Sequence, residues 1–62
     1  MGVQFRVYRD RAGEYRWRLV ASNGEKVAAS EGYVTKSGAL TSARRVKELA
    51  SSAVVVDTTV FA

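Results

Sequence analysis

The chain has 62 residues, a net charge of +4 and neither cysteine nor histidine. Its length allows one domain, assigned to residues 1–62, and so short a chain buries only about 60% of the surface that it exposes when unfolded. Without cysteine the chain forms no disulfide, and without cysteine and histidine it lacks the commonest ligands of transition metals. No apolar run approaches the roughly 20 residues that a helix needs to cross a bilayer. We therefore expect a cytoplasmic protein that gains stability from oligomerisation, with no cofactor and no membrane partner.

The first half of the chain predicts a β-hairpin. Apolar residues alternate with polar ones up to Tyr8 and again from Glu14, as in half-buried strands. The linker suits a three-residue loop at 11–13, a type I turn closed by Gly13 in the left-handed conformation. That loop pairs Val7 with Trp17 and Phe5 with Leu19, which places the apolar residues together on one face of the sheet.

Asn23-Gly24 predicts a second hairpin with a two-residue type I′ turn, in which both central residues take positive φ. The resulting pairs are Val20 with Val27, Leu19 with Ala28, Trp17 with Ser30 and Arg16 with Glu31. The last of these predicts an ion pair on the surface of the sheet.

A helical period follows Thr35. One stripe of the predicted helix is formed by Ala39, Leu40, Ala43, Val46, Leu49 and Ala50. Thr35 or Ser37 caps its start, Gly38 weakens the first turn by up to about 1 kcal/mol, and the pattern ends at residues 51–52.

The chain closes on a final predicted strand at residues 54–61, which is β-branched almost throughout. Its opening valines do not alternate with polar residues, which is typical of a strand covered on both sides. Since one copy of so small a chain cannot supply that cover, we expect the strand to pair with a second copy. The residues assigned to this dimer strand are Val54, Val55, Val56, Thr58, Val60 and Phe61.

Three short runs resemble the YegP-like family of small uncharacterised bacterial and archaeal proteins: EYRWRL at 14–19, NGE at 23–25 and SEGY at 30–33. The resemblance covers nearly the whole chain and implies an α+β fold. Each repeat of that family is a β-β-β-α-β unit with an antiparallel sheet and one helix packed on one face. Two repeats, in tandem or in two chains, join one sheet and exchange their final strands. This chain resembles a single-repeat member and is therefore expected to form a homodimer with exchanged C-terminal strands; the family implies no activity.

The candidate binding face is the side of the sheet opposite Trp17. Its members are Arg6, Tyr8, Arg16 and Arg18. Basic and aromatic side chains on an open sheet are typical of RNA and single-strand binders. The alternative is a solvated outer face on which Arg16 lies over Tyr8 in a cation–π contact, and we favour that alternative. Trp17 is assigned to the core under the helix.

The sequence offers no support for catalysis, because it lacks histidine and cysteine and has no paired carboxylates at a spacing that would oppose them across a cleft. Metal and phosphate sites are equally unsupported, so the catalytic, cofactor and metal residues are predicted to be none. The leading interpretation is a non-catalytic homodimeric interaction or stress-associated structural module. The alternative is a nucleic-acid-binding protein that uses the arginine-rich outer face, and an enzyme is a distant third.

Overall fold

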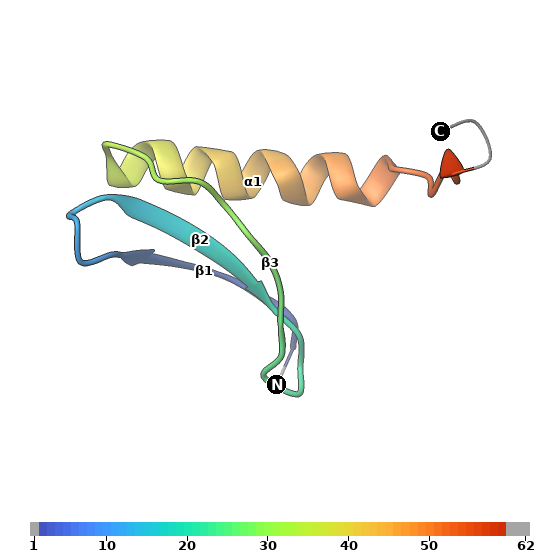
Figure 1. Cartoon of the computed structure of the whole chain (residues 1–62), viewed down its shortest axis with the longest axis horizontal. Helices are drawn as coiled ribbons and strands as arrows, with labels where there is room; N and C mark the ends of the chain where they lie inside the picture. Colours follow the sequence, from blue (N-terminus) through green and yellow to red (C-terminus); the bar gives the residue numbers. More distant parts are fainter. Residues whose placement is uncertain (1, 60–62) are drawn as a thin grey trace.

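The computed structural model describes residues 2–59, in which three antiparallel strands carry one helix on one side. The elements in chain order are β1 (Gln4–Arg9), β2 (Tyr15–Val20), β3 (Lys26–Ala29) and α1 (Lys36–Ser52). The sheet order is β1-β2-β3, so β1 and β3 are its two edges. Figure 1 shows α1 lying across one face of the sheet, which curves away from the helix. The predicted α+β class is confirmed.

The first hairpin has the predicted register, with Val7 opposite Trp17 and Phe5 opposite Leu19. Asp10 N donates to the Glu14 carbonyl at 2.8 Å, and Gly13 N donates to the Asp10 carbonyl at 3.1 Å. Gly13 has a φ of 87°, a region that a residue with a Cβ rarely enters. The three-residue loop and its left-handed glycine are therefore confirmed.

The second hairpin corrects the prediction of a type I′ turn. Among residues 2–59 only glycines have positive φ, so Asn23 does not take the conformation that this turn requires. Gly24 N instead donates to the Ala21 carbonyl, and Ala21 N to the Glu25 carbonyl, which makes a three-residue loop like the first one. The Asn23 side chain accepts a hydrogen bond from Glu25 N and so favours this turn.

A β-bulge follows from the longer loop. Val20 pairs with Lys26 rather than with Val27, as had been predicted, whereas Leu19 pairs with Ala28 in the predicted register. Val27 is thus the extra residue of β3, and the ladder regains its register one step later. Ser30 N then donates to the Trp17 carbonyl at 2.9 Å, as the predicted pairing requires.

The core between sheet and helix is small. Trp17 is only 7% exposed and meets Phe5 edge to face at a centroid distance of 5.2 Å, while Ala39 and Ala43 are buried on the helix. The Ser42 Oγ accepts hydrogen bonds from both Trp17 Nε1 at 2.9 Å and the Tyr33 hydroxyl at 2.8 Å. These two bonds satisfy the polar atoms that two aromatic side chains bring into the core.

The helix begins as predicted, with Thr35 as its N-cap. The Thr35 hydroxyl accepts a hydrogen bond from Gly38 N at 3.0 Å, which satisfies one of the amide groups that the first turn leaves unpaired. Gly38 approaches this hydroxyl so closely that an added Cβ would lie 3.2 Å from it. The close approach explains a glycine in the first turn.

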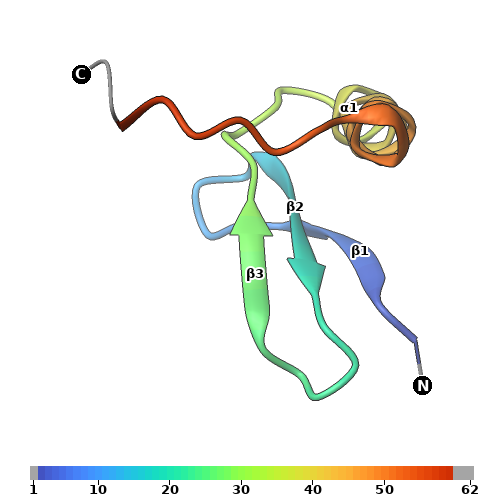
Figure 2. The ribbon, with the colours of Figure 1, turned by 90° about the vertical axis from the view of Figure 1, so that its right-hand side faces the viewer.

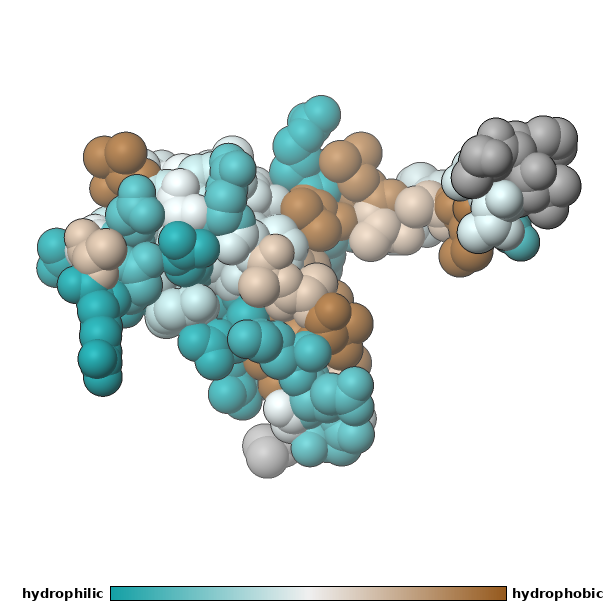
Figure 3. All heavy atoms as spheres, viewed as in Figure 1, coloured by the Kyte–Doolittle hydropathy of each residue, from teal (hydrophilic) through white to brown (hydrophobic). Residues whose placement is uncertain are grey.

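Residues 53–59, here called the C-terminal arm, form no strand within the single chain. They leave the end of α1 and extend beyond the sheet in an open course (Figures 1 and 2). Each of Val54, Val55 and Val56 is at least 68% exposed. Figure 3 shows hydrophobic surface recurring along this arm. Val60 and Phe61, which were also assigned to the dimer strand, lie outside the described residues.

Candidate functional site

The predicted binding face gathers on two neighbouring strands. Arg6 and Tyr8 come from β1, Arg16 and Arg18 from β2, and the register sets Arg6 opposite Arg18 and Tyr8 opposite Arg16. Because side chains alternate along a strand, all four lie on the face opposite Trp17. We call these four residues the outer face. The structure brings them together as the sequence indicated, and their role in binding stays a prediction.

The cation–π contact on the outer face joins a different pair from the one predicted. The guanidinium of Arg18 lies 4.2 Å from the centroid of the Tyr8 ring, whereas the sequence had assigned this contact to Arg16. Arg18 is the diagonal neighbour of Tyr8 and is free to lie over the ring because Arg16 is held elsewhere. One face of the tyrosine is thus covered by an arginine of the same chain.

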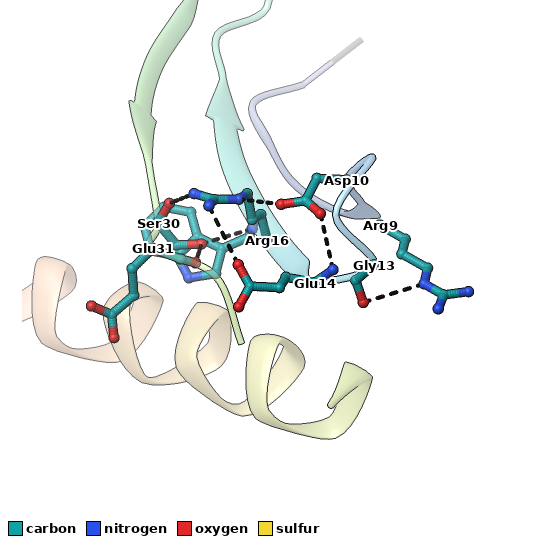
Figure 4. Close-up of polar contacts among 8 residues, drawn as sticks. Arg9, Asp10, Gly13, Glu14, Arg16, Ser30 and Glu31 are labelled. Carbon is teal, nitrogen blue, oxygen red and sulfur yellow. Dashed lines mark hydrogen bonds and ion pairs between the residues drawn. The ribbon is translucent and has the colours of Figure 1, made fainter. Parts of the chain in front are cut away.

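Arg16 is held by the carboxylate that follows β1. Its Nε donates to Asp10 Oδ2 at 2.7 Å, and its Nη2 lies 3.7 Å from Glu14 Oε1 (Figure 4). A further donor, Nη1, reaches the Ser30 carbonyl at 3.4 Å. The prediction that Arg16 pairs with Glu31 was wrong. Arg16 pairs with Asp10 instead, because the first turn fixes the Asp10 carboxylate beside it.

The turn and the ion pair share the Asp10 carboxylate. Its second oxygen, Oδ1, accepts a hydrogen bond from Glu14 N at 2.9 Å. The bond from Arg16, helped by the bond from Glu14 N, lowers the pKa of Asp10, and the same contact raises the pKa of Arg16. Both groups are therefore held in their charged forms, and Arg16 is not a free cation for a ligand.

Arg6 lies on β1, opposite Arg18 of β2. Its Nε donates to Gln4 Oε1 at 3.0 Å on the exposed surface. A shallow cavity of about 230 Å³ lies beside it, lined by Gly2, Gln4, Arg6, Val20 and the loop at 21–24. Val20 also lines this cavity and is only 6% exposed. On the outer face, Arg6 thus lies beside a shallow cavity and makes an exposed hydrogen bond to Gln4.

A second recess lies between β1 and α1, and the sequence did not single it out. Its volume is about 190 Å³, and the lining residues are Phe5, Val7, Leu40, Ala43, Arg44 and Lys47. We call it the β1–α1 groove. Its floor is apolar and its rim carries two cations of the helix. The alternation of β1 and the stripe of α1 predicted these apolar residues as core, but not that the space between them is left unfilled.

Two kinds of site are absent from the part of the chain that the structure describes. Residues 2–59 contain no group of three or more acidic side chains that could hold a metal ion, and the chain has no histidine or cysteine. Within the same range, no helix has the length and apolar character needed to cross a bilayer.

Three comparisons place the chain among known proteins. A family model described as a domain of unknown function, DUF1508, matches residues 10–57. UPF0339 protein Atu0232 of Agrobacterium fabrum is 45% identical over 56 residues, which are 90% of each chain. A UPF0339 protein of Stutzerimonas stutzeri, from the ptx operon 5′ region, is 50% identical over 48 residues. Those residues are 77% of this chain and 43% of that protein, so the chain spans less than half of its length.

Two solution NMR structures share the fold. A protein from Haloferax volcanii is 40% identical with a TM-score of 0.78, over 90% of this chain and 95% of that one. Protein ATU0232 from Agrobacterium tumefaciens is 42% identical with a TM-score of 0.74, over 95% of both chains.

Proposed function

The chain belongs to the DUF1508 family, and on that premise we propose that it works as a non-catalytic homodimeric interaction module whose C-terminal strands are exchanged between two copies. The observation that carries the proposal is the C-terminal arm. Its three consecutive valines are each at least 68% exposed, at the end of a chain whose sheet has two open edges.

The free-energy argument concerns the apolar surface of the arm. Burying a valine side chain from full exposure stabilises by about 1.5 kcal/mol or more, so three buried valines offset part of the entropy that is lost when the arm becomes ordered. The arm cannot bury them against its own sheet without turning back along α1. A second copy offers a sheet edge instead, and an added strand also covers unpaired backbone groups at that edge.

The small core supports the same proposal. Among residues 2–59 the buried hydrophobic side chains are those of Trp17, Val20, Ala39 and Ala43. Only one of them is large, and a chain of this size without disulfides or metal has little stability to spare. Association would therefore supply part of the folding free energy.

The relative from Stutzerimonas stutzeri is consistent with a paired unit. The matched segment is 43% of that protein, which leaves room in it for a second segment of similar length. A protein with two such units in one chain would achieve by covalent linkage what two copies of this chain achieve by association.

Binding of nucleic acid stays a prediction that the geometry of the outer face does not favour. Arg18 covers Tyr8, and Arg16 is neutralised by Asp10 and Glu14. A base that stacked on Tyr8 would first have to displace Arg18, and a phosphate at Arg16 would compete with two carboxylates. These contacts within the chain are typical of a solvated surface on which the arginine side chains already have partners.

The test is thermal unfolding at a series of protein concentrations that spans about a hundredfold. If two copies fold together, mass action makes the melting temperature rise with protein concentration. A melting temperature that stays constant across the series would contradict the homodimer.

A further inference from the structure

We infer that the β1–α1 groove of one copy is the acceptor for the C-terminal arm of the other, so that the arm pairs with the open edge of β1 and not with that of β3. This inference rests on the proposed homodimer and adds to it the receiving edge and the orientation of the arm. It is carried by the position of the helix, the backbone of β1, the lining of the groove and the charges on both partners.

The helix lies over the β1 side of the sheet. It packs on β1 and β2 but not on β3. Figure 2 shows α1 above β1, on the side away from β3, so a strand added beyond β1 would lie beneath the helix. A strand added beyond β3 would have no helix over either face. Only the β1 edge therefore offers helical cover for one face of the added strand, while the other face stays in solvent.

The backbone of β1 presents free hydrogen-bonding groups at the same place. Asp10 N donates to the Glu14 carbonyl, which makes residues 10 and 14 a hydrogen-bonded pair of the ladder. Because such pairs alternate with non-bonded ones, the N–H and C=O groups of Phe5 and Val7 point away from β2 toward the open edge. Phe5 and Val7 also line the groove with their side chains. One added strand would thus satisfy their backbone and fill the recess beside them.

The arm of the same chain does not fill this groove. In Figure 2 the arm leaves the end of α1 toward the β3 side, away from the recess between β1 and the helix. Its described side-chain hydrogen bonds stay within the arm, where Asp57 Oδ1 accepts from the Thr59 amide and hydroxyl. The fitting occupant is the equivalent arm of a second copy.

The alternation of side chains along an extended strand determines which residues of the arm enter the groove. In an extended strand Val54 and Val56 share one face, and Val55 and Asp57 share the other. The groove floor is apolar, so Val54 and Val56 face it and the Asp57 carboxylate stays in solvent.

The same orientation matches charges on the opposite face. It places Asp57 on the side of the sheet where β1 displays Gln4, Arg6 and Tyr8. Each copy carries a net charge of +4, so two copies repel, and a carboxylate brought to the side of Arg6 offsets part of that repulsion.

A pair of isosteric variants tests the orientation. Val56→Thr buries a hydroxyl in the groove, and we expect about a tenfold weaker dimer, whereas Val55→Thr on the solvent side should change the dissociation constant less than about twofold. Both side chains are exposed in the single chain, so neither change disturbs the core of one copy. An equal effect, or a larger effect of Val55→Thr, would overturn the orientation.

The acceptor edge is tested by isotope-filtered NMR on an equimolar mixture of ¹³C-labelled and unlabelled full-length chains, after sedimentation has measured the mass. We expect intermolecular contacts from the methyl groups of Val54 and Val56 to the ring of Phe5 and the methyl groups of Leu40. A sample of labelled chains alone is the control and gives no filtered signal. Amide exchange adds an independent readout, with Phe5 and Val7 protected and Ala29, at the β3 edge, exchanging fast.

The outcomes separate the inference from the proposal beneath it. A dimer whose arm contacts Ala28 and Ala29 of β3 would overturn the β1–α1 groove as acceptor and leave the homodimer intact. A monomeric mass would overturn the proposed function itself, and with it the exchange.

Discussion

Asp10 and Arg16 join the first turn to the outer face through a single carboxylate. Oδ2 of Asp10 lies 2.7 Å from Arg16 Nε, while Oδ1 accepts the amide of Glu14 that closes the turn. The first hairpin is therefore stabilised by an ion pair of its own, and Arg16 is held within the fold.

This relationship gives a pH dependence. Because the pKa of Asp10 is lowered in the folded protein, the ionised pair stabilises fully above the ordinary carboxyl pKa of 3.8, and that stabilisation is lost as the pH falls through the lowered value. We expect Asp10→Asn to lower the free energy of unfolding near neutral pH. The difference from the wild type should shrink as the pH drops below about 4. Urea titrations at several pH values measure this difference.

A control for the Asp10 experiment is Glu48→Gln, which removes one exposed carboxylate of α1 without touching the turn. It should leave the urea midpoint near that of the wild type throughout. A difference between Asp10→Asn and wild type that does not change with pH would contradict the role given to the carboxylate.

The two loop glycines should be far less tolerant than the one near the chain start. Gly13 and Gly24 have φ values of 87° and 89°, so Gly13→Ala and Gly24→Ala should each cost roughly 1 kcal/mol or more of unfolding free energy. A Cβ at Gly24 meets no atom within 4 Å, so the cost of Gly24→Ala comes from the backbone conformation and not from a steric clash. Gly2→Ala is the matched control, since it is also unobstructed and is not in the left-handed region. Equal tolerance at all three positions in chemical denaturation would show that the turns do not need glycine.

The sequence predicted the parts of the fold that follow from local pattern. Alternation set the register of the first hairpin, and the capping threonine set the start of α1. The type I′ turn was wrong because Asn-Gly also suits a three-residue loop, and periodicity gives no sign of the bulge at Val27 that accommodates it. Side-chain pairing was the least predictable part, because register alone cannot show that Arg16 turns to Asp10 and Arg18 to Tyr8.

Other features needed the three-dimensional arrangement. Ser42 was not singled out, although a serine beside the apolar stripe is a fitting partner for a buried tryptophan N–H. Gly32 gave no signal either, yet the Glu14 side chain occupies the space where a Cβ would lie. The β1–α1 groove depends on how far α1 overhangs the sheet, which no residue pattern encodes.

We expect that the outer face does not bind nucleic acid, even at low salt, where electrostatic binding is strongest. Fluorescence anisotropy with a labelled single-stranded oligonucleotide, over a series of salt concentrations, measures this directly. Tight binding at low salt, with an affinity that falls steeply as the salt concentration rises, would favour the alternative function. In that case Arg6→Gln, Arg16→Gln and Arg18→Gln together should reduce the salt slope by about 0.7 for each lost phosphate contact.

A charge in the C-terminal arm should disrupt the dimer, while a charge at another exposed valine outside the arm should not. Val56→Asp places a carboxylate in a dry interface, so the protein should become monomeric and lose most of its stability. Val34→Asp is the matched control, because Val34 is 86% exposed and lies outside the arm. Size-exclusion chromatography and circular dichroism of both variants give the answer. A folded Val56→Asp dimer would contradict the placement of the arm in an interface.

The central claim is that two copies of the chain form the folded unit. Sedimentation equilibrium of the full-length protein at micromolar concentration, combined with circular dichroism on the same sample, tests it most directly. The account predicts a folded species with twice the 6.8 kDa mass of one chain, and unfolding when the sample is diluted. A folded species with the mass of a single chain would contradict it.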